Sequence, residues 1–148
     1  MKAKQWFYRS RKRKDPIDRF SDLWRSFNNL YADMDGATER DRISDFLTKN
    51  ISEGSASRVL SEGRKSVEAL IQEPIVDMRG NGRSTAGQIA NFTSADCNLD
   101  RLMSLLQMVY QVRCNLEHGQ KSPTRPRDVE LCRASSEIMQ SILSLYFE

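Results

Sequence analysis

The sequence is organised around the stretch Val109-Tyr110-Gln111-Val112-Arg113-Cys114-Asn115-Leu116-Glu117-His118-Gly119-Gln120-Lys121, residues 109–121. This stretch ends the clearest amphipathic helix of the chain and contains its only histidine. Three cationic groups occur in it: the guanidinium of Arg113, the imidazole of His118 and the ammonium of Lys121. Such groups bind phosphates through charge-assisted hydrogen bonds. The stretch therefore predicts a site for a phosphate-bearing substrate.

The apolar positions predict an all-α protein of four to five helices. Asp15 suits an N-cap and Pro16 the first position of a helix. The apolar stripe of that helix is Ile17, Phe20, Leu23, Trp24, Phe27, Leu30 and Tyr31. Further helices are expected from Thr38 to about Lys49, from Ser55 to Gln72 with a weak point at Gly63, from Ser94 or Asn98 to His118, and from a cap at Asp128 to about Tyr146. No stretch has the pattern of a persuasive strand, so we expect a helical bundle.

The first 14 residues differ in composition from the rest of the chain. They hold seven Lys or Arg and no acid, whereas the remaining 134 residues carry four more acidic than basic residues. We therefore expect a basic N-terminal arm at 1–14 and a helical domain at 15–148. The arm either binds a polyanion, through Arg11, Lys12 and Arg13, or serves as a solubilising terminus. The aromatic residues 6–8 that precede this cluster either stack on bases or dock on the helical body.

Residues 74–93 show no helical periodicity and contain Arg79 and Arg83 between glycines. A structureless stretch of this length is often functional or disordered. It lacks the Lys-Ser/Thr pair and the preceding strand of a P-loop, so it is not a convincing nucleotide-binding loop. We expect a mobile loop whose two arginines contact the phosphate-bearing substrate.

The cysteines and the apolar runs indicate the compartment. Cys97, Cys114 and Cys132 are odd in number and form no Cys-x-x-Cys pair, which is typical of reduced thiols in a cytosolic protein. No apolar run approaches the length of a membrane span or of a signal-peptide core. One histidine and scattered cysteines make no metal-ligand set, so we expect neither a metal nor a cofactor. We expect a cytoplasmic protein that does not act at a membrane.

Arg113 and His118 are five positions apart, which is about 140° around an ideal helix. They converge only if the helix breaks at Gly119 or if two copies of the helix meet across a symmetry axis. On spacing alone, a surface arginine beside a helix-capping histidine is the better explanation of the pair. Cys114 also lies one turn before His118, but no third group that would complete a cysteine hydrolase is evident.

Two motifs of this sequence resemble HEPN domains of the ApeA-like branch. Residues 112–121 are similar to that branch's VRNNLFHGGK sequence, and residues 15–31 are similar to its ID-F--LW-AFN-LY helix. The motifs lie about 90 residues apart in the expected order, so the resemblance covers most of residues 15–146.

The resemblance implies an HEPN-like bundle, usually a homodimer, with metal-independent endoribonuclease activity. Arg113 and His118 take the family's Arg-x4–6-His catalytic positions and form a composite site from both subunits. His118 acts as a base on the ribose 2′-OH or as an acid toward the leaving 5′-oxygen, Arg113 stabilises the phosphorane, and Asn115 binds the phosphate or orients His118. The products are a 2′,3′-cyclic phosphate and a 5′-hydroxyl. The resemblance therefore implies RNA as the partner, and we expect Lys121, Cys114, Arg79, Arg83 and the basic arm to bind it.

The sequence departs from the family's active pattern at three positions, where Cys114, Glu117 and Gln120 replace a polar residue, an aromatic residue and a glycine. An active chain is expected to be a toxin or an antiviral defence effector held by an antitoxin or another partner. A chain inactivated by these departures is a dimerising module that binds RNA or nucleotide. A helix-turn-helix DNA binder is a third and weaker alternative, because no helix pair has the required short turn and basic face.

Overall fold

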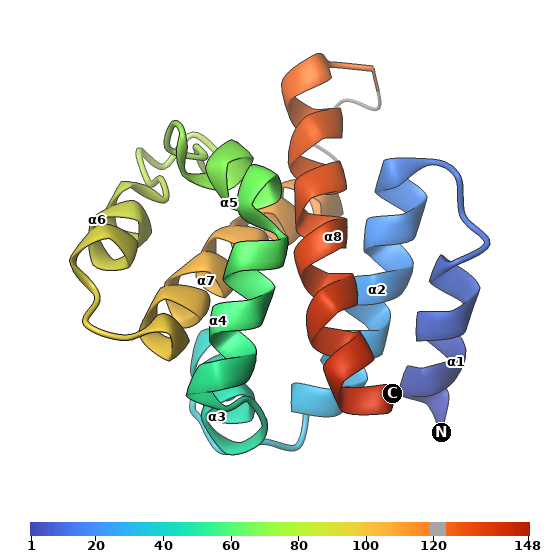
Figure 1. Cartoon of the computed structure of the whole chain (residues 1–148). Coiled ribbons are helices and arrows are strands. Elements are labelled where there is room, and N and C mark those ends of the chain that lie inside the picture. The colour runs from blue at the N-terminus through green and yellow to red at the C-terminus, as the bar shows by residue number, and fades with distance from the viewer. Residues whose placement is uncertain (119–123) are drawn as a thin grey trace.

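The computed structural model describes residues 1–118 and 124–148, and these residues form eight α-helices and no strand (Figure 1). The helices are α1 (Lys2–Ser10), α2 (Pro16–Tyr31), α3 (Glu39–Asn50), α4 (Glu53–Glu62), α5 (Arg64–Ile71), α6 (Ala86–Ser94), α7 (Asn98–Glu117) and α8 (Pro126–Phe147). The all-α class that the sequence predicts is confirmed. The helices outnumber the four to five expected, because residues 2–10 and 86–94 are also helical and Gly63 separates α4 from α5.

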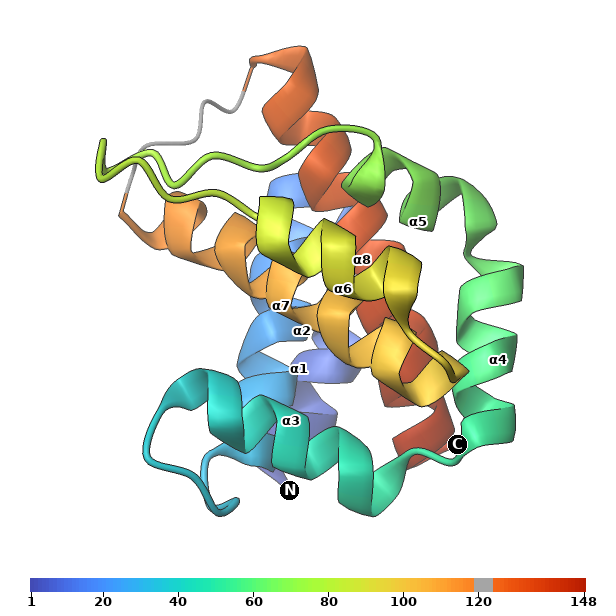
Figure 2. The ribbon, with the colours of Figure 1, turned by 90° about the vertical axis from the view of Figure 1, so that its left-hand side faces the viewer.

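The helices pack as a bundle around α2, α7 and α8 (Figures 1 and 2). α1 packs along the outer side of α2, α8 packs between α2 and α5, and α6 lies along α7. The core runs through all of these contacts and is richest in α2, α7 and α8. Phe20, Leu23 and Phe27 of α2 are fully buried there. Rings of α2 also contact one another and α3, as in the edge-on pair of Phe27 and Phe46.

Side-chain caps begin several of these helices. Asp15 accepts hydrogen bonds from the backbone N–H groups of Ile17 and Asp18 at 2.8 and 3.1 Å, as its position before Pro16 predicts. Thr38 caps α3 in the same way. The start of α7 is capped from another helix, because the carboxylate of Glu53 on α4 accepts the N–H groups of residues 98 and 99. These long-range bonds fix α7 against α4.

The basic N-terminal segment is part of the bundle. Phe7 has no exposed surface, and Ala3 is almost fully buried against α2. The hydroxyl of Ser26 on α2 donates to the carbonyl of Ala3 at 2.6 Å. Phe7 therefore docks on the helical body, whereas Tyr8 is 39% exposed. Residues 11–14 link α1 to the capping residue of α2 and belong to neither helix.

Two expectations about local structure were wrong. Residues 74–93 are not one unstructured loop, because α6 begins at Ala86. The last helix begins at Pro126, and Asp128 lies buried in its first turn, where its carboxylate is near the positive end of the helix dipole. Pro126 can take the first helical position because that residue needs no hydrogen-bonded N–H.

Candidate functional site

A groove of about 600 Å³ lies where the loop between α5 and α6 meets the C-terminal end of α7. Figure 2 shows this loop extending over the end of α7. Its cationic lining residues are Arg40 of α3, Arg79 and Arg83 of the loop, Arg113 of α7 and His118 at the end of α7. Among the described residues, the acids that line the groove are Asp77 and Glu117. Cationic groups are in excess, so the groove suits an anionic ligand.

The loop is a tight reversal of the chain between residues 75 and 85. The N–H of Asp77 donates to the carbonyl of Arg83 at 2.9 Å, and the N–H of Thr85 donates to the carbonyl of Ile75 at 3.0 Å. Gly80 and Gly82 have φ of +74° and +76° at the tip, a conformation that other residues adopt only with strain. Both arginines of the loop are therefore placed by a defined turn.

Asp77 organises the tip of this loop. Its side chain is 4% exposed and accepts two hydrogen bonds from the guanidinium of Arg79, at 3.0 and 2.8 Å. Asn81 donates to the same carboxylate at 3.1 Å. The hydrogen bonds from Arg79 hold the pKa of Asp77 well below its usual value. Among the described residues Arg83 takes part in no ion pair, so its charge is uncompensated in the groove.

Asn115 ties the loop to α7. Its side chain is buried and donates to the carbonyl of Val76 at 2.9 Å. Its Oδ1 accepts the backbone N–H of Met78 and the side-chain amide of Gln111, both at 3.1 Å. Asn115 is not among the lining residues of the groove. Its position supports the loop from behind rather than facing a ligand.

Arg113 lies between two carboxylates. It forms an ion pair with Glu117 one turn later in α7, and its Nη1 lies 3.7 Å from Oε2 of Glu39 on α3. Burial acts to lower the pKa of Arg113, but the charges of Glu39 and Glu117 outweigh burial and raise it. The guanidinium is thus permanently charged and held in place, with 26% of its side chain exposed.

Glu39 is in turn fixed by two tyrosines. The hydroxyl of Tyr31 donates to one of its carboxylate oxygens, and the hydroxyl of Tyr110 donates to the other at 2.9 Å. Burial is the largest cause that raises the pKa of Tyr31, and its hydrogen bond to Glu39 and the Glu39 charge raise this pKa further. Burial and the nearby Cys114 thiol, together with Glu39, raise the pKa of Tyr110. Both hydroxyls therefore remain protonated donors to Glu39 at neutral pH.

His118 follows the last helical residue of α7. Its backbone N–H donates to the carbonyl of Cys114 at 3.1 Å, and its side chain is exposed at the rim of the groove. Cys114 is partly buried and lines the same groove.

Five of the residues singled out in the sequence come together. Arg79, Arg83, Arg113, Cys114 and His118 all line one groove of a single chain. Arg113 and His118 share it because the helix ends at Glu117 and the backbone at His118 departs from helical geometry, with ψ of 5°. Lys121 lies outside the described residues.

The basic residues after α1 do not line this groove. Arg11 pairs with Glu148 at the C-terminus, and Arg13 pairs with Asp22 of α2 at 3.0 Å. Lys12 lines a separate pocket on α1.

Sequence reasoning missed Glu39 and Arg40, which reach the site from the first turn of α3. The guanidinium of Arg40 stacks 4.6 Å from the ring centre of Tyr110 and donates to Oε1 of Gln107 at 2.8 Å. An acid and an arginine at the start of a helix look like ordinary surface residues. No signal in the sequence relates them to a stretch some 70 residues away.

Comparison of the chain with protein-family models, with curated proteins and with solved structures gives no match. In the part of the chain that the structure describes, no helix is long and apolar enough to cross a membrane. The described residues also contain no group of three His, Cys, Asp or Glu side chains arranged to hold a metal ion.

Proposed function

We propose that this protein is a metal-independent endoribonuclease of the HEPN type and that the groove at the end of α7 is its active site. The supporting observation is that Arg113 and His118, the two residues that match the family's motif, line one groove with three further arginines. A scissile phosphate that binds in this groove is flanked by the guanidinium of Arg113 and the imidazole of His118. Arg40, Arg79 and Arg83 provide charge for the flanking phosphates.

The proposed reaction is an internal phosphoryl transfer. The ribose 2′-oxygen attacks the adjacent phosphorus, and its proton passes to the His118 imidazole. The bond from phosphorus to the 5′-oxygen then breaks, and the imidazolium returns the proton to that oxygen. Arg113 neutralises charge on the phosphorane. The products are a 2′,3′-cyclic phosphate and a 5′-hydroxyl, and the imidazole ends the step in its initial state.

The surrounding residues position this pair. Glu39, with the hydroxyls of Tyr31 and Tyr110, holds the Arg113 guanidinium from the side of α3. We assign Asn115 to positioning, because its amide is committed to Val76, Met78 and Gln111. A fixed guanidinium needs no reorganisation when charge develops on the phosphate.

A binding module without turnover is the second candidate function. The ion pair between Glu117 and Arg113 favours the binding module, because the Glu117 carboxylate occupies guanidinium donors that a phosphate would use. In this alternative the groove binds RNA or nucleotide, and Cys114 replaces the polar residue of active relatives. The Glu117 side chain is 56% exposed and an RNA phosphate competes for the same guanidinium, so we prefer the enzyme.

The resemblance also implies a homodimer with a composite site and a role as a toxin or antiviral defence effector. We retain both as parts of the proposal: in the composite arrangement the grooves of two subunits adjoin, and the scissile phosphate is bound by Arg113 of one chain and His118 of the other. An endoribonuclease that cuts RNA in the cytoplasm is harmful to its own cell, so an antitoxin or another defence-system partner is expected to restrain it. No metal or other cofactor takes part in the proposed reaction.

The products provide the test of this function. Purified protein is incubated with end-labelled single-stranded RNA in excess EDTA, and the new ends are analysed. We expect 3′-fragments that a kinase can label directly at a 5′-hydroxyl, and 5′-fragments that require removal of a cyclic phosphate before ligation. Products with 5′-phosphates would exclude attack by the 2′-oxygen. Binding of the same RNA with no cleavage would establish the binding module instead.

A further inference from the structure

Three arginines converge on one buried carboxylate beside the groove. Asp22 of α2 has no exposed side-chain surface, and its oxygens lie 3.0 Å from Nε of Arg13, 3.2 Å from Nη1 of Arg25 and 3.6 Å from Nε of Arg9. A buried carboxylate is stable only when it is paired. One carboxylate compensates one guanidinium, so this arginine cluster keeps two uncompensated positive charges. We use the term arginine cluster for Arg9, Arg13 and Arg25 around Asp22.

The arginine cluster is exposed on its outer side and carries an aromatic ring. The side chains of Arg9 and Arg25 are 55% and 54% exposed although both contact Asp22. Trp6 contacts both, with its ring centre 5.3 Å from the Arg9 guanidinium and 5.0 Å from that of Arg25. Guanidinium edges bind phosphates, and an indole ring stacks on a base. The cluster therefore offers both contacts that a nucleotide makes.

A smaller pocket connects the arginine cluster to the groove. It has a volume of about 310 Å³ and lies between α2 and α7. Arg25 lines this pocket and belongs to the arginine cluster, whereas Arg113 and Glu117 line both this pocket and the groove. Arginines thus line a path from Arg83 in the groove through Arg113 and Arg25 to Arg9, with Glu117 beside Arg113 on the way.

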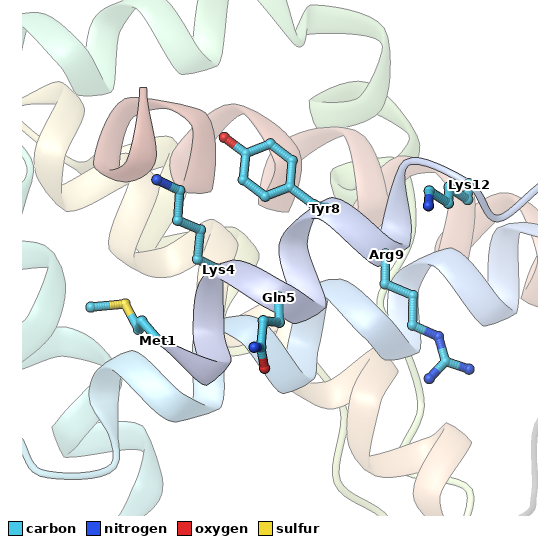
Figure 3. A pocket seen from close by; sticks show the side chains of 6 residues that line it. All are labelled: Met1, Lys4, Gln5, Tyr8, Arg9 and Lys12. Carbon is cyan, nitrogen blue, oxygen red and sulfur yellow. The ribbon is translucent and has the colours of Figure 1, made fainter.

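The outer face of α1 extends the positive charge further. Figure 3 shows Lys4 and Lys12 on this face with Tyr8, whose ring centre lies 5.9 Å from the Lys4 ammonium. Arg9 leaves α1 on the side of α2, toward Asp22. The apolar side of α1 is buried in the bundle through Ala3 and Phe7. The exposed face of this helix is the one that carries the cations, and its charge favours a polyanion as the partner.

We propose that the arginine cluster is a second RNA subsite, which binds the continuation of the single strand whose scissile phosphate lies in the groove. The inference rests on the proposed function for the identity of the ligand. A single strand fits this path because its flexible backbone follows a row of separated cations and its unpaired bases can stack on Trp6. The substrate is then a single-stranded RNA several nucleotides longer than the dinucleotide that contains the cleaved bond.

Binding of uncleavable RNA tests this subsite independently of catalysis. Fluorescently labelled 2′-O-methyl RNAs of 3 and 12 nucleotides lack the attacking hydroxyl, and their affinities are measured by anisotropy at two salt concentrations. Arg25→Gln and Arg9→Gln each leave two arginines on Asp22. We expect each to weaken binding of the 12-mer about tenfold, as for loss of one charge-assisted hydrogen bond, and to leave the 3-mer unchanged. The slope of log affinity against log salt should fall by about 0.7 for each lost phosphate contact.

Two controls separate this effect from general changes of charge or folding. Arg58→Gln removes a somewhat more exposed arginine on α4, outside the groove and the arginine cluster, and should leave both affinities unchanged. Arg25→Lys keeps the charge and should recover most of the lost affinity. Thermal unfolding of each variant confirms that the bundle is intact.

The results distinguish failure of the subsite from failure of the proposed function. Unchanged 12-mer affinity in folded Arg25→Gln and Arg9→Gln would overturn the subsite even if the wild type cleaves RNA. Weakened 12-mer binding in a protein that cleaves nothing would support the subsite and refute the ribonuclease. Preferential binding of vesicles containing phosphatidylserine, with RNA binding insensitive to both variants, would also overturn the subsite in favour of a lipid surface.

Discussion

The side-chain amide of Asn115 donates to the carbonyl of Val76 at 2.9 Å and so joins the end of α7 to the loop that carries Arg79 and Arg83. The two residues are 39 positions apart, and this bond is one of three that Asn115 makes. This connection holds the loop against α7 at one edge of the groove. The buried side-chain amide of Asn115 thus positions residues on both sides of the groove.

We predict that Asn115→Ala loosens the groove. The substitution leaves the Val76 carbonyl and the Met78 N–H without their partner, which costs about 1–3 kcal/mol for a buried polar group. Urea denaturation should show this loss, and the Met78 amide should exchange faster with solvent. Asn29→Ala, at an exposed site on α2, is the matched control and should change the unfolding free energy by less than about 0.5 kcal/mol. Wild-type exchange at Met78 in Asn115→Ala would contradict the positioning role.

The fold should lose stability in alkali because of Tyr31. Burial and the bond to Glu39 raise its pKa in the folded state, so its contribution is complete below the unfolded pKa of about 10 and disappears as the pH rises through the folded value. Above pH 10 the unfolding free energy should fall by about 1.4 kcal/mol per pH unit for this one group. Tyr31→Phe should lower the slope by this amount and leave the part that Tyr110 contributes, because the pKa of Tyr110 is also raised, whereas Tyr8→Phe, at an exposed ring, should keep the full slope. Equal slopes in the two variants would refute the assignment to Tyr31.

Glu117 should act as a competitor of RNA for Arg113. Glu117→Gln removes the charge that pairs with this guanidinium, and we expect uncleavable RNA to bind about twofold to fivefold more tightly, as for loss of a half-exposed ion pair. Glu62→Gln on α4 breaks a similar pair with Arg58 four residues away and is the control for the change in net charge. Weaker RNA binding by Glu117→Gln than by Glu62→Gln would mean that Glu117 organises the site rather than blocks it.

Mixing two inactive variants should reveal whether the site is composite. A homodimer that takes Arg113 from one subunit and His118 from the other regains one complete site when Arg113→Ala and His118→Ala chains exchange. We expect the mixture to recover up to about a quarter of the wild-type rate. Absence of any recovery, with exchange shown by differently tagged chains, would place the whole reaction in the groove of one subunit.

The apolar pattern of the sequence predicted α2, α3, the α4–α5 segment, α7 and α8, but neither α1 nor α6, nor all of the buried faces. The stripe of α2 is buried as expected at Phe20, Leu23, Trp24, Phe27 and Tyr31. Asp22 and Ser26 are buried as well, because α1 covers a second face of α2. A basic segment gives no sign that it will pack in this way. Its apolar side consists of little more than Ala3 and Phe7.

The sequence predicts the residues proposed to act on the phosphate, but it does not predict the residues that hold them in place. Arg113 and His118 could be found because they are local in sequence and resemble a family motif. Glu39, Arg40 and the role of Asn115 could not, because each depends on contacts between segments roughly 40 to 70 residues apart. Only the packing of α3 and of the loop against α7 brings these residues to Arg113 and Tyr110.

The most direct measurement is the initial rate of single-stranded RNA cleavage in EDTA at neutral pH by the wild type, Arg113→Ala and His118→Ala. Arg58→Ala serves as the control for removal of an exposed arginine, and circular dichroism verifies that all variants are folded. Both site variants should lose at least about 100-fold in rate, since each removes a group that acts on the transition state, while the control keeps the wild-type rate. Wild-type cleavage by either site variant, or cleavage only after a divalent metal is restored, would contradict the proposed active site.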